Sequence, residues 1–146
     1  MEPRDVLKNI YLFRNATPEE LAAVAAIAEP KSHMVEEYLY RAGDAPDAIY
    51  IVESGTIDIT LKDKDVPLGS VGSGQALGEM AFFERGERLA TAVTREPTRL
   101  LRLPFAKLDQ VFAAHPKLAT TFYFQACMLL SRHLRMLAPD LNRRYL

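Results

Sequence analysis

The 146-residue sequence contains one cysteine, Cys127, no tryptophan and no long apolar run. A single cysteine excludes an intramolecular disulfide, which is typical of proteins that fold in a reducing compartment. The longest apolar run covers the eight residues 21–28, whereas a helix needs about 20 apolar residues to cross a bilayer. Residues 1–5 also lack the basic and apolar regions of a secretory signal. We therefore expect a cytoplasmic protein with no membrane segment.

An excess of charge of either sign is also missing. With 18 basic and 19 acidic side chains the formal net charge is -1, so no global positive field attracts nucleic acid or an anionic membrane. The histidines at positions 33, 115 and 133 are far apart, unlike the ligands of a zinc site. No P-loop or G-x-S-x-G elbow occurs. The sequence therefore predicts no catalytic residue, no metal, no cofactor and no direct contact with nucleic acid.

Helical signals occupy residues 1–30. Thr17, Pro18 and Glu20 form a capping box, with threonine as the N-cap, proline at the first helical position and glutamate three residues after the cap. An alanine-rich stretch continues to Ala28, and Pro30 ends it. The pattern predicts one helix in this part of the chain.

The periodicity changes to that of β-strands in residues 31–103, where it becomes clear from His33 onward. Short runs of strand-forming residues, some with alternating polarity, lie between turn signals such as Gly43-Asp44 and Ser54-Gly55. Several strands at such close spacing indicate an antiparallel sandwich or barrel. The clearest predicted strands are residues 48–53, 56–61, 90–95 and 98–103.

Helical periodicity returns in residues 104–138, and a short tail, 139–146, follows. One helix is expected from Pro104 to the break at His115-Pro116, and a longer one from about Lys117 to Leu137. The longer helix is too widely apolar for one buried face, so its second surface packs either on its own domain or on a partner chain. Its apolar positions are Leu118, Phe122, Ala126, Leu129, Leu130, Leu134 and Leu137.

Residues 78–88 combine features suited to an anion. Gly78 follows a glycine-rich turn and precedes a helix-prone stretch, and a helix start presents unpaired backbone N–H groups. Arg88 opens the next strand, and a guanidinium holds a phosphate by two parallel hydrogen bonds. Glu79 would repel a phosphate, so a sugar hydroxyl is its better partner. The same residues also allow a simple surface ion pair between Glu79 and Arg88.

Residues 78–82 (GEMAF) and 88–92 (RLATA) resemble the phosphate-binding cassette of cyclic nucleotide-binding domains. Residues 43–55 are similar to the turn-and-strand signature in the first half of the same domain. The resemblance implies one domain over residues 1–146, mainly β: a jelly-roll-like β-roll of about eight antiparallel strands with an N-terminal helix and two C-terminal helices. The last helix is implied to act as a lid over the ligand.

The resemblance also implies a role for each site residue. Arg88 neutralises the cyclic phosphate, Glu79 accepts a hydrogen bond from the ribose 2′-OH, and Gly78 permits close approach. The backbone N–H groups at Met80, Ala81 and Leu89 complete the phosphate cradle. The family often has a small or hydroxylated residue at the position of Leu89, and leucine lacks the hydroxyl that binds guanine. The ligand is therefore expected to be cAMP rather than cGMP.

The prediction is a non-catalytic cyclic nucleotide sensor that signals through its C-terminal helix to a protein partner or a second copy of itself. Two alternatives remain at this stage. One is a ligand-free β-roll that serves as a protein-interaction module. The other is the sensor part of a DNA-binding transcription regulator without its effector domain.

Overall fold

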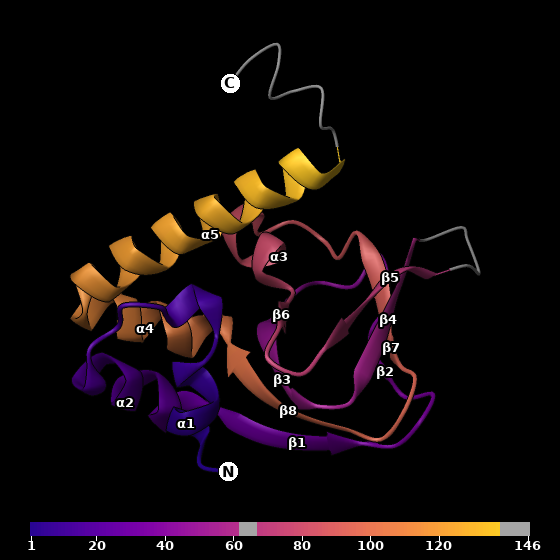
Figure 1. Ribbon diagram of the computed structural model, residues 1–146, viewed down its shortest axis with the longest axis horizontal. Coiled ribbons are helices and arrows are strands. Elements are labelled where there is room, and N and C mark those ends of the chain that lie inside the picture. Colours follow the sequence, from indigo (N-terminus) through magenta and orange to yellow (C-terminus); the bar gives the residue numbers. More distant parts are fainter. Residues whose placement is uncertain (62–66, 138–146) are drawn as a thin grey trace.

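Eight antiparallel strands in two four-stranded sheets make up the body of the molecule (Figure 1). The computed structural model describes residues 1–61 and 67–137. In spatial order the first sheet contains β1 (Glu29–His33), β8 (Thr98–Pro104), β3 (Ala48–Ser54) and β6 (Ala76–Leu77). The second contains β2 (Tyr38–Tyr40), β7 (Ala90–Thr94), β4 (Thr56–Leu61) and β5 (Pro67–Gly72). The predicted β-roll with about eight antiparallel strands is confirmed.

The four strands that the sequence marks most clearly are β3, β4, β7 and β8, within a residue or so of the expected bounds. β1 was not expected, and it starts at Glu29, before the predicted change of periodicity at residue 31. Pro30 ends the preceding helix and yet lies within β1. It is tolerated because β1 is an edge strand that pairs only with β8, and proline is compatible with an edge.

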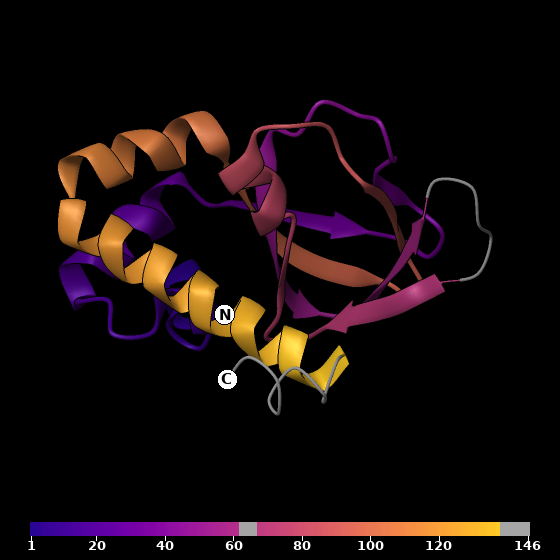
Figure 2. The same cartoon turned by 90° about the horizontal axis from the view of Figure 1, so that it is seen from above.

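Five helical segments gather at one end of the roll (Figures 1 and 2). They are α1 (Pro3–Lys8), the 3-10 turn η1 (Tyr11–Phe13), α2 (Pro18–Ile27), α4 (Phe105–Ala114) and α5 (Pro116–Leu137). The capping box of α2 is confirmed, since Glu20 N–H donates to Thr17 Oγ1 at 3.1 Å and Thr17 N–H donates to Glu20 Oε1 at 2.8 Å. The two C-terminal helices are also confirmed, whereas α1 and η1 were not foreseen. The predicted tail lies outside the described residues.

The main core lies where the helices meet the first sheet, and it contains a group of phenylalanine rings in contact with one another. The ring of Phe122 lies 5.5 Å from that of Phe13 and 5.0 Å from that of Phe112, centroid to centroid. A second, smaller cluster lies inside the roll around Val52, Ile57 and Leu100. Because aromatic side chains bury a large area each, the first cluster fixes the helices against the roll.

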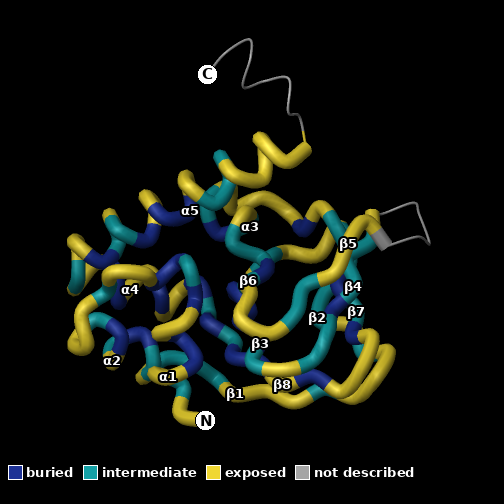
Figure 3. Tube along the Cα trace, viewed as in Figure 1, coloured by how far each residue is buried: buried dark blue, intermediate teal, exposed yellow. Residues whose placement is uncertain are grey.

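The long helix α5 divides along its length (Figure 3). Leu118, Phe122 and Ala126 on its first half are buried against the domain, whereas Leu134 and Leu137 near its end are exposed. From the helical end of the molecule α5 extends across toward the roll and passes near α3 (Glu79–Glu84) (Figure 1). Among the described residues no helix combines the length and the hydropathy needed to cross a membrane.

Candidate functional site

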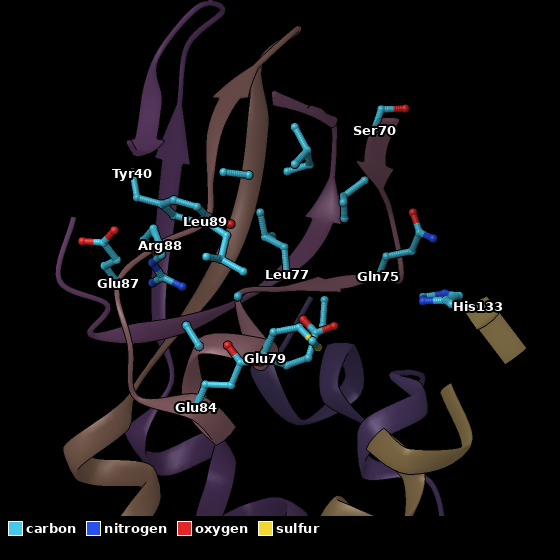
Figure 4. Close-up of a pocket in the computed structure, with 17 residues that line it drawn as sticks. Tyr40, Ser70, Gln75, Leu77, Glu79, Glu84, Glu87, Arg88, Leu89 and His133 are labelled. Atoms are coloured by element: carbon cyan, nitrogen blue, oxygen red, sulfur yellow. The ribbon is translucent and has the colours of Figure 1, made fainter. Parts of the chain in front are cut away.

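A cavity of about 420 Å³ opens between the second sheet, β6 and α3 (Figure 4). Its volume lies within the range of roughly 300–1,000 Å³ that is typical of small-molecule sites. The six residues that the sequence singled out all line this one cavity: Gly78, Glu79, Met80, Ala81, Arg88 and Leu89. The fold therefore brings the two predicted motifs, 78–82 and 88–92, to the same place.

Gly78 stands directly before α3 and has the left-handed backbone conformation, with φ of 87°. A Cβ atom here would lie 2.7 Å from Arg88 Nη1 and 3.2 Å from the carbonyl oxygen of Ala48. The backbone angle and the lack of space both demand glycine. The group that approaches Gly78 in this structure is the guanidinium of Arg88.

Arg88 is buried, with 3% of its surface exposed. Its Nη2 donates to the carbonyl oxygen of Ala48 at 2.7 Å, and its guanidinium carbon lies 4.1 Å from the centre of the Tyr40 ring. Its Nε and Nη1 have no hydrogen-bond partner among the described residues. Buried polar groups are normally paired, because an unpaired donor costs about 1–3 kcal/mol and a charged one more. The site therefore holds two donors of a fixed cation that suit an anionic ligand.

Arg88 and Glu79 do not form the simple ion pair that the sequence left open. Among the described residues the acidic group within 4.0 Å of Arg88 is Asp47, whose Oδ1 lies 3.9 Å from Nη2. Glu79 is half-buried, and loss of solvent raises the pKa of its carboxyl, while a hydrogen bond from its own backbone and the charge of His133 act in the opposite direction. Both side chains therefore remain available at the cavity.

Met80 and Ala81 occupy the first turn of α3, where backbone N–H groups have no partner within the helix. Leu89 lies beside Arg88 with 68% of its surface exposed, and Met80 is also exposed. These two side chains form an apolar rim around the charged part of the cavity. A ligand with both an anionic and an apolar part suits such a lining.

Several lining residues were missed by the sequence analysis. Tyr40 lies beneath the guanidinium, and burial raises the pKa of its phenol to about 12. Gln75 and His133 lie on the far side of the cavity from Arg88 (Figure 4). His133 is exposed and nevertheless lines the cavity. Tyr40 and His133 come from β2 and α5, so no local spacing in the sequence connects them with the cassette.

Comparison with known proteins identifies the family of the domain. Residues 30–115 match the family model of the cyclic nucleotide-binding domain. The cAMP-dependent protein kinase regulatory subunit of Candida albicans is 36% identical over 60% of this chain and 18% of its own length. The cyclic AMP receptor protein of Thermus thermophilus is 31% identical over 66% of this chain and 46% of its own length.

A solved structure adds a match in three dimensions. The regulatory domain of Toxoplasma gondii PKA, crystallised with cAMP, aligns with a TM-score of 0.70 at 26% identity, over 75% of this chain and 43% of that one. The chain spans less than half the length of each of these relatives. The family model covers more than half of the sequence and the fold agrees with it. The chain therefore belongs to the family of cyclic nucleotide-binding domains, which are regulatory domains.

Proposed function

We propose that this domain is a non-catalytic cytoplasmic sensor that binds cAMP in the cavity beside Arg88. The observation that carries the proposal is the buried guanidinium with two unpartnered nitrogens at the cavity wall. A cyclic phosphodiester has one negative charge, which complements the charge of the guanidinium, and two free oxygen atoms, either of which can accept a hydrogen bond from an unpartnered nitrogen of Arg88. An ion pair of this kind is strongest where water is excluded.

The rest of the nucleotide follows from the position of the phosphate. Glu79 accepts a hydrogen bond from the ribose 2′-OH in its ionised form, and first-turn N–H groups at Met80 and Ala81 face the phosphate. The base extends along the apolar rim away from Arg88. Support for cAMP comes from the two relatives and the solved structure, whose names all refer to cAMP, and from Leu89, which has no hydroxyl for guanine.

Ligand binding is proposed to act on α5. Helix α5 contributes His133 to the lining of the cavity. Its Phe122 packs in the aromatic core. A ligand shifts the position of α5 only to the extent that its affinity differs between two positions. Comparing hydrogen exchange of α5 with and without cAMP measures this shift.

The partner surface is proposed to be the exposed face of α5. Phe124 is 60% exposed, Leu134 is 56% exposed, and Cys127 lies exposed between them. These positions follow the spacing of three and then seven residues that keeps side chains on one face of a helix, and none of them is charged. We propose that a second copy of the chain covers this face. Multi-angle light scattering of wild type and Phe124→Glu tests this, and we expect a dimer only for wild type. The same mass for both proteins overturns the proposal.

Calorimetric titration with cAMP and cGMP tests the binding site. We expect Arg88→Ala to weaken cAMP binding about tenfold or more, because a hydrogen bond to a charged group contributes roughly 1.5–3 kcal/mol. Arg88→Lys retains the charge but loses the forked geometry, so it should bind with intermediate affinity. Arg99→Ala is the matched control, because Arg99 is an exposed arginine of β8 that does not line the cavity.

Thermal melting of each variant without ligand shows that it is folded. Equal affinity of wild type and Arg88→Ala for cAMP discards the site. No binding of either nucleotide by folded wild type favours the alternative of a ligand-free interaction module. A DNA-binding regulator would need a further domain, and binding of cAMP by this chain is compatible with it.

A further inference from the structure

Among the described residues of α5, only His133 lines the cavity. The other lining residues come from the sheets, from α3 and from the segments on either side of α3. In Figure 4 the imidazole of His133 lies beside Gln75, across the cavity from Arg88. A nucleotide whose phosphate binds Arg88 therefore extends its base toward His133.

The charges around the cavity are mainly negative. The ionisable side chains that line it together with His133 come from α3, from the segment after α3 and from β2: Glu79, Glu84, Glu87, Arg88 and Tyr40. The strands β4, β5 and β6 contribute no charged lining residue among those described. Arg132, the neighbour of His133 on α5, places its guanidinium over the ring of Tyr11, 5.0 Å from the ring centre. Of these groups, the carboxylate of Glu79 interacts electrostatically with His133.

We propose that His133 is the residue through which α5 recognises the bound nucleotide, and that its protonated form does so better than its neutral form. The inference rests on the proposed function and names a regulation of the same site. Histidine is the side chain that ordinarily changes charge between pH 5 and 8. A protonated imidazole has two N–H donors, whereas the neutral ring has one donor and one acceptor. The charged form therefore attracts Glu79 with one edge and donates to a base nitrogen with the other.

The direction of the pH dependence follows from linkage. A protein that binds its ligand more tightly when a group is protonated takes up protons on binding, and its affinity for the ligand rises as the pH falls. Neither the phosphodiester nor the adenine ring titrates between pH 6 and 8. Glu79 acts in the opposite direction, because its ionised form is the stronger acceptor for the ribose hydroxyl, so protonation of Glu79 weakens binding. A rise in affinity at lower pH therefore identifies His133 and not Glu79.

The experiment is calorimetric titration of cAMP at pH 6, 7 and 8, each in two buffers of different ionisation enthalpy. We expect wild type to bind about two- to fivefold more tightly at pH 6 than at pH 8, the size of a solvent-accessible charge interaction, with proton uptake. His133→Gln should bind with the weaker affinity at every pH. His133→Lys should keep the tighter affinity throughout, because its charge is permanent in this range. His115→Gln is the matched control, since His115 caps the C-terminus of α4 and does not line the cavity.

The possible failures are distinct. Wild-type affinity that does not change with pH overturns the proposal, as does a pH dependence that His133→Gln retains. A dependence that disappears in Glu79→Gln but persists in His133→Gln assigns the proton to Glu79 and has the same consequence. If folded wild type binds no cAMP at any of the three pH values, the proposed function itself fails and the inference fails with it.

Discussion

One side of α3 packs in the apolar core, whereas the other side lines the cavity. On one side Phe82, with 1% of its surface exposed, packs in the aromatic core, its ring 5.1 Å from that of Phe105 and 6.0 Å from that of Phe122. On the other side, where Met80, Ala81 and Glu84 line the cavity, the nearby Arg88 is buried without a full set of partners. The first side is complete without ligand, and the second is not.

The difference teaches how a short helix serves stability and binding at once. Apolar packing is non-directional and roughly proportional to buried area, so the Phe82 side holds α3 in place. Unpaired buried polar groups are unfavourable, and the Arg88 side is stable only because the aromatic side supports it. Binding of an anion removes that penalty, and we expect substitutions on the two sides to affect different quantities.

Truncation of Phe82 should have the greatest effect on stability. Phe82→Ala leaves a cavity in the aromatic core, and we expect a loss of about 3–5 kcal/mol in the free energy of unfolding, measured by urea denaturation. Leu68→Ala is the matched control, because Leu68 is an apolar residue exposed on β5, and the change should be within about 0.5 kcal/mol. A loss below about 1 kcal/mol for Phe82→Ala contradicts the supporting role of the aromatic side.

Gly74 and Gly78 have the same left-handed backbone conformation but differ in the space available for a side chain. Gly78 and Gly74 have φ of 87° and 83°, but a Cβ would collide with Arg88 only at Gly78. We expect Gly74→Ala to lose about 1–2 kcal/mol of stability from the left-handed backbone alone. Gly78→Ala should lose more and should also weaken cAMP binding, as measured by denaturation and calorimetry. Equal effects of both variants on affinity contradict the assigned contact with Arg88.

Glu79→Gln should increase stability and decrease affinity. Because burial raises the pKa of Glu79 above its ordinary value, the folded state holds the proton more tightly than the unfolded state. The free energy of unfolding therefore falls as the pH rises through the pKa of Glu79, and it is lower at pH 7 than at a pH where Glu79 is protonated. Glutamine has no charge to desolvate, so we expect a higher Tm for the ligand-free variant at pH 7 and weaker cAMP binding. A lower Tm with unchanged affinity rules out the proposed role of the carboxylate.

The ion pair between α3 and α4 should contribute least. Arg85 Nη2 donates to Asp109 Oδ1 at 2.7 Å, and both side chains are about half exposed. Exposed pairs contribute about 0–1 kcal/mol, so a double-mutant cycle of Arg85→Ala and Asp109→Ala should give a coupling energy in that range by urea denaturation. A coupling above about 2 kcal/mol means that α3 depends on this pair and not on Phe82 for its support.

The sequence predicted the parts of the fold and the site that depend on neighbouring residues. The capping box at Thr17, the strand at residues 56–61 and the helix-prone run after Gly78 are local signals, and all three elements appear in the structure as expected. β1 was missed because its tolerance of Pro30 depends on being an edge strand, which is a property of the sheet. Tyr40 and His133 were missed because only the tertiary fold brings β2 and α5 to the cavity.

The most direct test follows the guanidinium of Arg88 itself. In a nuclear magnetic resonance titration of the 15N-labelled protein with cAMP, we expect the Nε–H signal of Arg88 to shift strongly as the free donor acquires an anionic acceptor. The Nε–H signal of Arg85, which already donates to the carbonyl oxygen of Phe82 at 2.7 Å, should move little and serves as the internal control. Saturable binding of cAMP that leaves the Arg88 signal in place would contradict the account.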